Sequence, residues 1–268
     1  MKHAILLALL AAARRAGPVR LVETHAGAGL YDLRGELATR SGEAETGIGR
    51  VMAAGTLPAP LDGLRAAVER ENDAGDLRLY PGSPVLALGA LGAGDRYVGC
   101  ELRPDDYGAL AATLARRTGA GVPNKAALSK TQGRAVNADG YAVLANEAAA
   151  GDLVLIDPPY ERGDEYDRVV EAAALCRARA AACVIWAPIK DLETFDALLR
   201  RIEALTPQQL TVAEVRLRPL TNPMAMNGCA MVLIDAPDIQ AEADDISAWV
   251  AAHCGGAAAR GGAKALIP

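Results

Sequence analysis

Aromatic residues are scarce in this chain of 268 residues, at 4% of the composition. A core of this size must therefore be built mainly from alanine, valine and leucine. Hydrophobic residues make up 51% and charged residues 23%, which excludes a disordered chain and indicates a globular protein. The length suits one large α/β domain or two small ones.

Cysteines are few, and no two of them stand in a CxxC spacing. An odd number without that spacing argues against both structural zinc and a disulfide framework. We therefore expect no metal, buried free thiols and a cytoplasmic protein. The five cysteines are Cys100, Cys176, Cys183, Cys229 and Cys254.

The chain has no apolar run long enough to span a bilayer, so no membrane is expected. The run Ala4 to Ala13, preceded by Lys2, resembles a secretory signal in its composition. Arg14 and Arg15 follow it at once, however, and cleavage there would leave a mature chain starting almost at a strand. The segment 2–16 is therefore predicted to be a first helix packed on the core.

An excess of positive charge is also missing. The net charge is −5 and the sequence pI is about 5.3, which argues against a dedicated nucleic-acid coat but not against a local basic face. Each basic cluster taken alone is interpreted as an ordinary solvated surface. These clusters are Arg14, Arg15 and Arg20; Arg116, Arg117, Lys125, Lys130 and Arg134; and Arg216 and Arg218.

What the chain does contain is a regular alternation of apolar strands and helices. This pattern predicts an α/β fold with a mostly parallel, doubly wound sheet, whose ligands bind at the carboxyl ends of the strands. The last two predicted strands, 210–220 and 228–237, form a candidate antiparallel pair. The Ala/Gly-rich tail from Gly255 is predicted to be mobile near its middle.

The segment GDLVLIDPPYE, 151–161, contains the strongest chemical signal. Two successive prolines stop a central strand, because proline lacks a ladder donor. Asp157 and the Pro158 carbonyl then form two acceptors for an exocyclic amino group, which localise its nitrogen lone pair. Asp157 can also accept the proton lost after transfer, and Tyr160 can stack on a base flipped from its helix. The simpler interpretation is a strand followed by a proline-rich loop.

Two further features follow predicted strands. The turn HAGAG, 25–29, allows close backbone approach to a ligand, although a tight turn without a ligand fits equally. Glu101 ends the second strand, where nucleoside-binding folds hold ribose hydroxyls. Its separation from the turn far exceeds the usual 20 or so residues, unless an insertion intervenes. We expect a core of 1–35 and 78–268, with 36–77 as an inserted helical subdomain.

Several blocks, in order along nearly the whole chain, resemble one known family. The sequence is similar to the RlmJ-type 23S ribosomal RNA adenine-N6 methyltransferases, which use S-adenosylmethionine. The resemblance implies a class I, Rossmann-like methyltransferase fold with seven strands and a small helical insertion after the first strand. The blocks are THAGAG (24–29), LRLYPGSP (77–84), ELRPDDY (101–107), ADGY (138–141), LVLIDPPYE (153–161), NPMAMNGCAMVLIDAP (222–237) and the closing ALIP (265–268).

The resemblance also implies site residues. Asp157 would be catalytic, with Pro158 and Tyr160 beside it. Glu101 would accept from ribose hydroxyls and Asp139 from the cofactor's adenine amino group. Without the resemblance, Ser83 is a helix N-terminal serine and Asp139-Gly140 a turn. The implied cofactor contacts are His3, His25, Gly27, Ser83, Glu101, Asp139, Gly140 and Asp157.

The function expected from these features is methylation of N6 of an adenine in 23S ribosomal RNA by a monomer. The same chemistry on DNA adenine or a protein glutamine remains open. The family also has a stretch before its Lys-His pair, which aligns here with Lys2-His3. A third interpretation is therefore an inactive cofactor- or RNA-binding module that lacks this segment.

Overall fold

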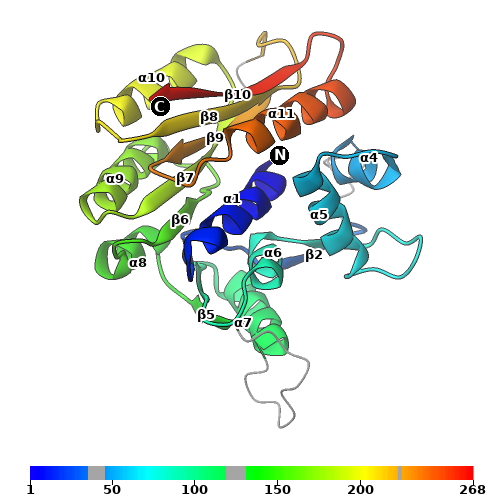
Figure 1. The fold of residues 1–268 in the computed structure, drawn as a ribbon, viewed down its shortest axis with the longest axis horizontal. Helices are drawn as coiled ribbons and strands as arrows, with labels where there is room; N and C mark the ends of the chain where they lie inside the picture. The colour runs from blue at the N-terminus through cyan, green and yellow to red at the C-terminus, as the bar shows by residue number, and fades with distance from the viewer. Residues whose placement is uncertain (36–45, 119–130, 223–224, 268) are drawn as a thin grey trace.

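A central sheet of eight strands organises the protein, seen in a computed structural model that describes residues 1–35, 46–118, 131–222 and 225–267 (Figure 1). The strand order is β10-β8-β9-β7-β6-β1-β4-β5. The strands are β1 (Arg20–Glu23), β4 (Arg96–Cys100), β5 (Gln132–Val136), β6 (Leu153–Ile156), β7 (Ala182–Ile189), β8 (Leu210–Arg216), β9 (Gly228–Ile234) and β10 (Arg260–Ile267).

The direction of the strands defines the ligand-binding edge. Strands β5, β4, β1, β6 and β7 run parallel, whereas β9 is antiparallel to both β7 and β8. The chain winds outward from β1 to β5 on one side and from β6 to β9 on the other. The carboxyl ends of β1 and β6 therefore meet at a topological switch point, where ligands bind in such sheets. The predicted α/β, mostly parallel sheet is confirmed.

The predicted number of seven strands was wrong, because the tail forms an eighth. Strand β10 pairs antiparallel with β8, so the expectation of a mobile tail was wrong over this stretch. Its small residues serve a close approach to α11 (Gln240–Cys254): a Cβ on Gly261 would lie 2.2 Å from the Ser247 carbonyl oxygen. The small residues of β10 therefore allow this strand to pack closely against α11.

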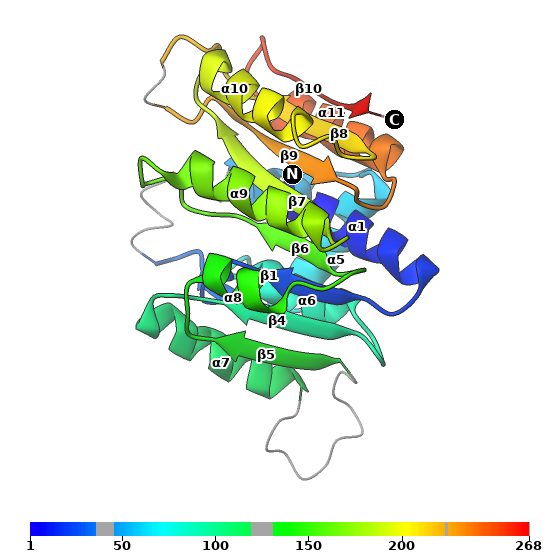
Figure 2. The same cartoon turned by 90° about the vertical axis from the view of Figure 1, so that its left-hand side faces the viewer.

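Helices cover both faces of the sheet. Figure 2 shows α8, α9 and α10 in front of the sheet, whereas α1, α6, α7 and α11 lie on the opposite face. The bounds are α1 (Lys2–Ala16), α6 (Ser83–Ala90), α7 (Pro104–Thr118), α8 (Gly140–Glu147), α9 (Glu165–Ala178) and α10 (Leu192–Glu203).

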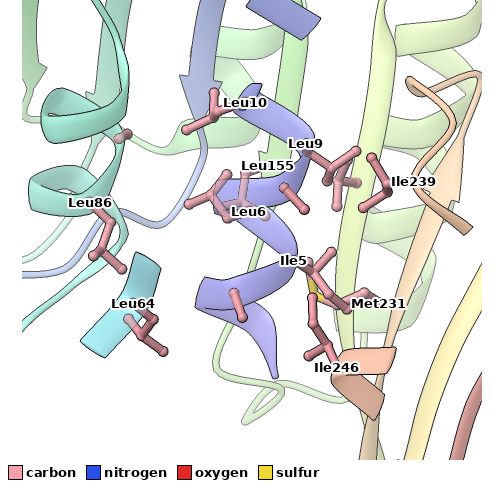
Figure 3. Close-up of a cluster of buried hydrophobic side chains, with 14 of the residues drawn as sticks. Ile5, Leu6, Leu9, Leu10, Leu64, Leu86, Leu155, Met231, Ile239 and Ile246 are labelled. Atoms are coloured by element: carbon pink, nitrogen blue, oxygen red, sulfur yellow. The ribbon is translucent and has the colours of Figure 1, made fainter. Parts of the chain in front are cut away.

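The apolar N-terminal run is buried in this fold. Ile5, Leu6, Leu9 and Leu10 of α1 are fully or almost fully buried and meet side chains from α6, α11, β6 and β9 (Figure 3). Each buried leucine contributes roughly 1.5–3 kcal/mol. The prediction of a core-packed first helix is confirmed. In the described part of the chain, no helix combines the length and the hydropathy that a membrane span requires.

The described part of the region between β1 and α6 contains a small two-stranded sheet and the helices α4 and α5. The sheet pairs β2 (Leu30–Asp32) antiparallel with β3 (Leu79–Pro81), and between them lie α4 (Ile48–Ala53) and α5 (Ala59–Glu69). Leu61, Leu64 and Val68 of α5 join the apolar cluster that surrounds α1. The helical part of this region therefore packs directly against the sheet-covering layer.

Candidate active site

The loop after β6 lies at the switch point, and its prolines determine its shape. Pairing of β6 with β7 ends at Ile156, so the predicted abrupt end of the strand is confirmed. Asp157 is half-buried and Pro158 buried. Tyr160 has a φ of 52°, in the left-handed region that aromatic residues seldom adopt. Backbone strain of this kind is a feature of functional loops.

The Asp157 carboxylate is held by a lysine from α1. Lys2 Nζ donates a hydrogen bond to Asp157 Oδ2 and forms an ion pair with it. Burial by itself would lower the pKa of Lys2, but the nearby Asp157 outweighs this effect and raises the pKa to about 12. Lys2 is therefore charged at neutral pH, and its ammonium group holds the Asp157 carboxylate in place by a hydrogen bond and an ion pair.

A second carboxylate, Glu23, lies beneath this pair at the end of β1. Its side chain is 0% exposed and accepts hydrogen bonds from the hydroxyls of Ser83 and Tyr97, the latter at 2.7 Å. Burial raises the pKa of Glu23 to about 7, although both hydrogen bonds and the charge of Lys2 act in the opposite direction. The Ser83 hydroxyl is thus directed at Glu23 in this structure.

His3 and His25 are both neutral at physiological pH. Burial lowers the pKa of His3 well below its usual value, and His3 Nδ1 lies 2.6 Å from the Tyr80 hydroxyl. Burial likewise lowers the pKa of His25 to about 4. His25 Nδ1 lies 2.8 Å from Thr24 Oγ1, and its ring meets Tyr141 edge-on. Each ring can therefore donate or accept a hydrogen bond without adding charge.

The glycine turn is joined to Glu101 on the neighbouring strand. The Gly27 N–H donates to Glu101 Oε2 at 2.9 Å, and the Arg103 N–H donates to Oε1 at 2.8 Å. Gly27 has a φ of 62°, and a Cβ there would lie 2.1 Å from the Tyr31 hydroxyl oxygen. The left-handed φ favours glycine at this position. Because a carboxylate has about four acceptor sites, Glu101 keeps capacity for further donors.

Asp139 caps helix α8 and forms an ion pair with α9. Its Oδ1 accepts from the Tyr141 N–H at 2.9 Å, and its Oδ2 lies 2.5 Å from Arg168 Nη2. Burial would raise the pKa of Asp139, but these contacts outweigh it and lower the pKa. Arg168 also lies 4.3 Å from the centre of the Tyr141 ring.

Gly140 has a structural reason to be glycine. A Cβ there would lie 2.0 Å from the Thr24 carbonyl oxygen, because α8 begins directly against the end of β1. The local role of Asp139 is that of the N-cap of α8, with Gly140 as the first helical residue, whereas the simpler sequence interpretation of this pair was a turn. The role of both residues at a cofactor stays a prediction.

Tyr160 is directed toward β7. Its hydroxyl donates to the Trp186 carbonyl oxygen at 2.8 Å, and its ring lies 4.9 Å from that of Tyr166. Only 8% of the residue is exposed. The ring is thus fixed by its own contacts, and its stacking on a substrate base stays a prediction.

The predicted site residues all lie along one edge, where contacts or electrostatic interactions link them. His25 interacts with both Asp157 and Asp139, and Glu23 with both Lys2 and Asp157. Sequence reasoning missed Glu23 and Arg168 and gave Lys2 no role. For Glu23 a signal existed, since a carboxylate that ends an apolar strand stands at the ligand edge. No local pattern pointed to Arg168.

The cysteines and carboxylates of the described ranges, 1–35, 46–118, 131–222 and 225–267, do not gather into a metal site. Within them no group of three or more histidine, cysteine, aspartate or glutamate side chains has suitable geometry. All five cysteines are free, and Cys100, Cys176 and Cys183 are buried.

The strand order, the switch point and the acidic residues at the ends of β1, β4 and β6 define the fold of a class I methyltransferase. A solved structure shares this fold. The crystal structure of a Legionella pneumophila protein superposes with a TM-score of 0.82 at 24% identity, covering 98% of this chain and 94% of that one.

The particular family follows from sequence comparison. A family model described as "Ribosomal RNA large subunit methyltransferase D, RlmJ" matches residues 17–265. The chain belongs to this family, and the resemblance seen in its sequence is confirmed.

Two curated relatives bear the name "Ribosomal RNA large subunit methyltransferase J". The protein of Escherichia coli (strain K12) is 29% identical over 239 residues, or 87% of this chain and 81% of its own length. That of Haemophilus influenzae is 30% identical over 219 residues, or 81% of this chain and 74% of its own length.

Proposed function

We propose that this protein transfers a methyl group from S-adenosylmethionine to N6 of an adenine in 23S ribosomal RNA. The observation that carries the proposal is the position of Asp157 and Pro158 at the switch point, beyond the last ladder pair of β6. Family membership and the names of two relatives support the same substrate class.

The chain's own residues would activate the amino group. The Asp157 carboxylate and the Pro158 carbonyl accept its two hydrogens, which localises the nitrogen lone pair. Lys2 fixes the position of the Asp157 carboxylate, which would also take the proton that the nitrogen loses after transfer. Holding the two reacting groups in line supplies much of the remaining rate acceleration.

The residues at the edge suit the cofactor. Glu101 offers acceptor capacity to ribose hydroxyls, with Gly27 hydrogen-bonded beside it. Asp139 would accept from an adenine amino group, with Gly140 beside it. His3, His25 and Ser83 would surround the methionine end with uncharged donors and acceptors. When bound, S-adenosylmethionine supplies an electrophilic methyl group on its sulfonium.

The test is an Asp157→Ala variant assayed with labelled cofactor on deproteinised 23S ribosomal RNA. Transfer should be abolished while the thermal unfolding temperature and the calorimetric affinity for S-adenosylmethionine stay close to wild type. Full activity in this variant would refute the mechanism.

The same assay separates the alternatives. Duplex DNA and a protein with an accessible glutamine are tested beside the RNA. Methylation of either in place of RNA would reassign the substrate. Absence of measurable cofactor binding to the wild-type chain would favour an inactive module.

We also propose that residues 36–77 are an insertion in a core of 1–35 and 78–268, and that the protein acts as a cytoplasmic monomer. Support for the insertion comes from β2 and β3, which pair with each other and so bring its two ends together.

A further inference from the structure

Large apolar side chains are exposed at only one edge of the described part of the molecule. The four that qualify are Tyr31, Leu102, Leu192 and Met226, with exposed fractions of 42%, 64%, 38% and 42%. Tyr31 and Leu102 lie on the β1–β4 side, next to the glycine turn and Glu101. Leu192 and Met226 lie on the opposite side of Asp157, where β7 ends and β9 begins.

A buried asparagine holds this second side together. Asn227 is 2% exposed, and its N–H donates to the carbonyl oxygen of Ile189, the last residue of β7. Its side-chain amide donates to the Lys190 carbonyl oxygen at 2.8 Å, and its own carbonyl accepts from the Arg218 N–H at 3.1 Å. Asn227 thus fixes the backbone of Lys190 and Arg218, and Met226 precedes it directly in the chain. Leu192 lies two residues after Lys190.

Two cations of this surface form no ion pair, unlike the arginines at the rest of the edge. Arg103 and Arg162 form ion pairs with Asp106 and Asp164. Lys190 and Arg218, by contrast, take part in none of the ion pairs found among the described residues. The nearby Asp191 carboxylate accepts hydrogen bonds from the N–H and hydroxyl of Thr194 as the cap of α10, and neither it nor the exposed Glu193 forms an ion pair with these two cations.

Five of the ten basic residues in the clusters seen in the sequence are neutralised, whereas Arg15 and Arg116 form no ion pair among the described residues. Arg14, Arg20, Arg117, Arg134 and Arg216 each pair with an acidic side chain. Lys125 and Lys130 lie outside the described residues. The β7 end therefore combines unpaired cations with exposed apolar groups, and it lies beside the strand that leads into Asp157.

Strand β7 also extends past its neighbour. Its pairing with β6 stops at Ile185, and it continues for four more residues to Ile189 while paired with β9. Lys190 thus projects beyond the level at which Asp157 leaves the sheet. This half of the edge is separated by β6 from the half that contains Glu101.

We propose that Lys190, Leu192, Arg218 and Met226 form the surface that grips the RNA strand on either side of the target adenine; we call it the β7 rim. The inference rests on the proposed function and extends it to the path of the substrate. Lys190 and Arg218 neutralise backbone phosphates. Leu192 and Met226 contact the base face that is uncovered when the adenine leaves its stack.

The phosphate contacts are tested with the double variant Lys190→Gln/Arg218→Gln. Binding to deproteinised 23S ribosomal RNA is measured between 50 and 200 mM salt, alongside methylation kinetics. The plot of log affinity against log salt should become less steep, with the magnitude of its slope reduced by roughly 1–2. Binding should be about tenfold weaker, and KM should rise. The affinity for S-adenosylmethionine should not change.

A matched control removes the same charges elsewhere. The control variant is Arg260→Gln/Lys264→Gln, with both residues on β10 at the far edge of the sheet. Both side chains are exposed, and neither forms an ion pair among the described residues. This variant should bind RNA with the wild-type slope. Equal slopes for both double variants would overturn the β7 rim.

The apolar contacts are tested with Leu192→Ala/Met226→Ala. The salt slope should stay at the wild-type value, while the fluorescence of 2-aminopurine placed at the methylated position should rise less on binding. An unchanged fluorescence gain would remove these two residues from the rim. The wild-type protein could bind RNA with a salt slope that the Lys190→Gln/Arg218→Gln variant reduces, and yet methylate no RNA. That result would refute the proposed function and support the β7 rim as an RNA-binding surface.

Discussion

Lys2 and Asp157, 155 residues apart in the chain, form an ion pair that joins the first turn of α1 to the loop after β6. The candidate catalytic carboxylate is therefore anchored to the helix whose apolar face fills the core. Its position depends on the packing of α1 as much as on the two prolines that follow it.

Replacing Lys2 with methionine should lower kcat/KM. The substitution keeps the apolar stem and removes the ammonium group that fixes the Asp157 carboxylate. We expect a loss on the order of 10- to 100-fold, equivalent to about 1.4–2.7 kcal/mol of transition-state stabilisation. Steady-state kinetics on 23S ribosomal RNA measures it. Lys2→Arg is the matched control and should keep most of the activity; a fully active methionine variant would show that the pair has no catalytic role.

Glu23 should make stability depend on pH. Its pKa is about 7 in the fold against an ordinary value of 4.5, so the folded state binds the proton more tightly than the unfolded chain. This contribution is fully present below pH about 4.5 and is lost as pH rises through about 7. It amounts at most to roughly 3 kcal/mol. Unfolding temperatures at pH 5 and pH 8.5 should differ by several degrees more in wild type than in Glu23→Gln.

The exposed Glu171 on α9 provides the control for that measurement. Glu171→Gln should follow the wild-type pH profile. A Glu23→Gln profile as steep as that of wild type would mean that the buried carboxyl does not titrate in this range.

Gly140→Ala should destabilise the fold. The new Cβ would meet the Thr24 carbonyl oxygen at 2.0 Å, and both are backbone-anchored. Displacing α8 from the end of β1 costs about 1–3 kcal/mol, as overpacking generally does. Thermal or denaturant unfolding measures the change. Gly108→Ala on α7, where a Cβ meets nothing within 4 Å, should be neutral or slightly stabilising; equal effects at both sites would contradict the clash.

Asp139→Ala should affect both stability and cofactor affinity. Loss of the α8 cap costs about 1 kcal/mol. Loss of an acceptor for an adenine amino group weakens S-adenosylmethionine binding about tenfold, measured by calorimetry. Asp191→Ala removes an equivalent cap from α10 and should lower stability alone. Unchanged affinity in Asp139→Ala would leave only the capping role.

Much of the architecture could be predicted because it is encoded locally. The alternation of apolar strands with amphipathic helices indicated a parallel sheet. Tandem prolines stopped β6 by removing ladder donors at two successive residues, so Asp157 had to leave the sheet at its carboxyl edge. The tail was misjudged for the opposite reason: Gly261 and Gly262 have low intrinsic strand preference, and only the available edge of β8 and the closeness of α11 make them a strand.

The site divides in the same way. The sequence alone determined which acidic and glycine residues end strands, since that depends on backbone preferences within a few neighbours. Only the tertiary structure decided that Ser83 donates to Glu23, that Lys2 pairs with Asp157 and that Arg168 holds Asp139. Those contacts join elements distant in the chain, and they arise because packing α1, α6 and α9 on the sheet brings their polar ends to the edge that the strands define.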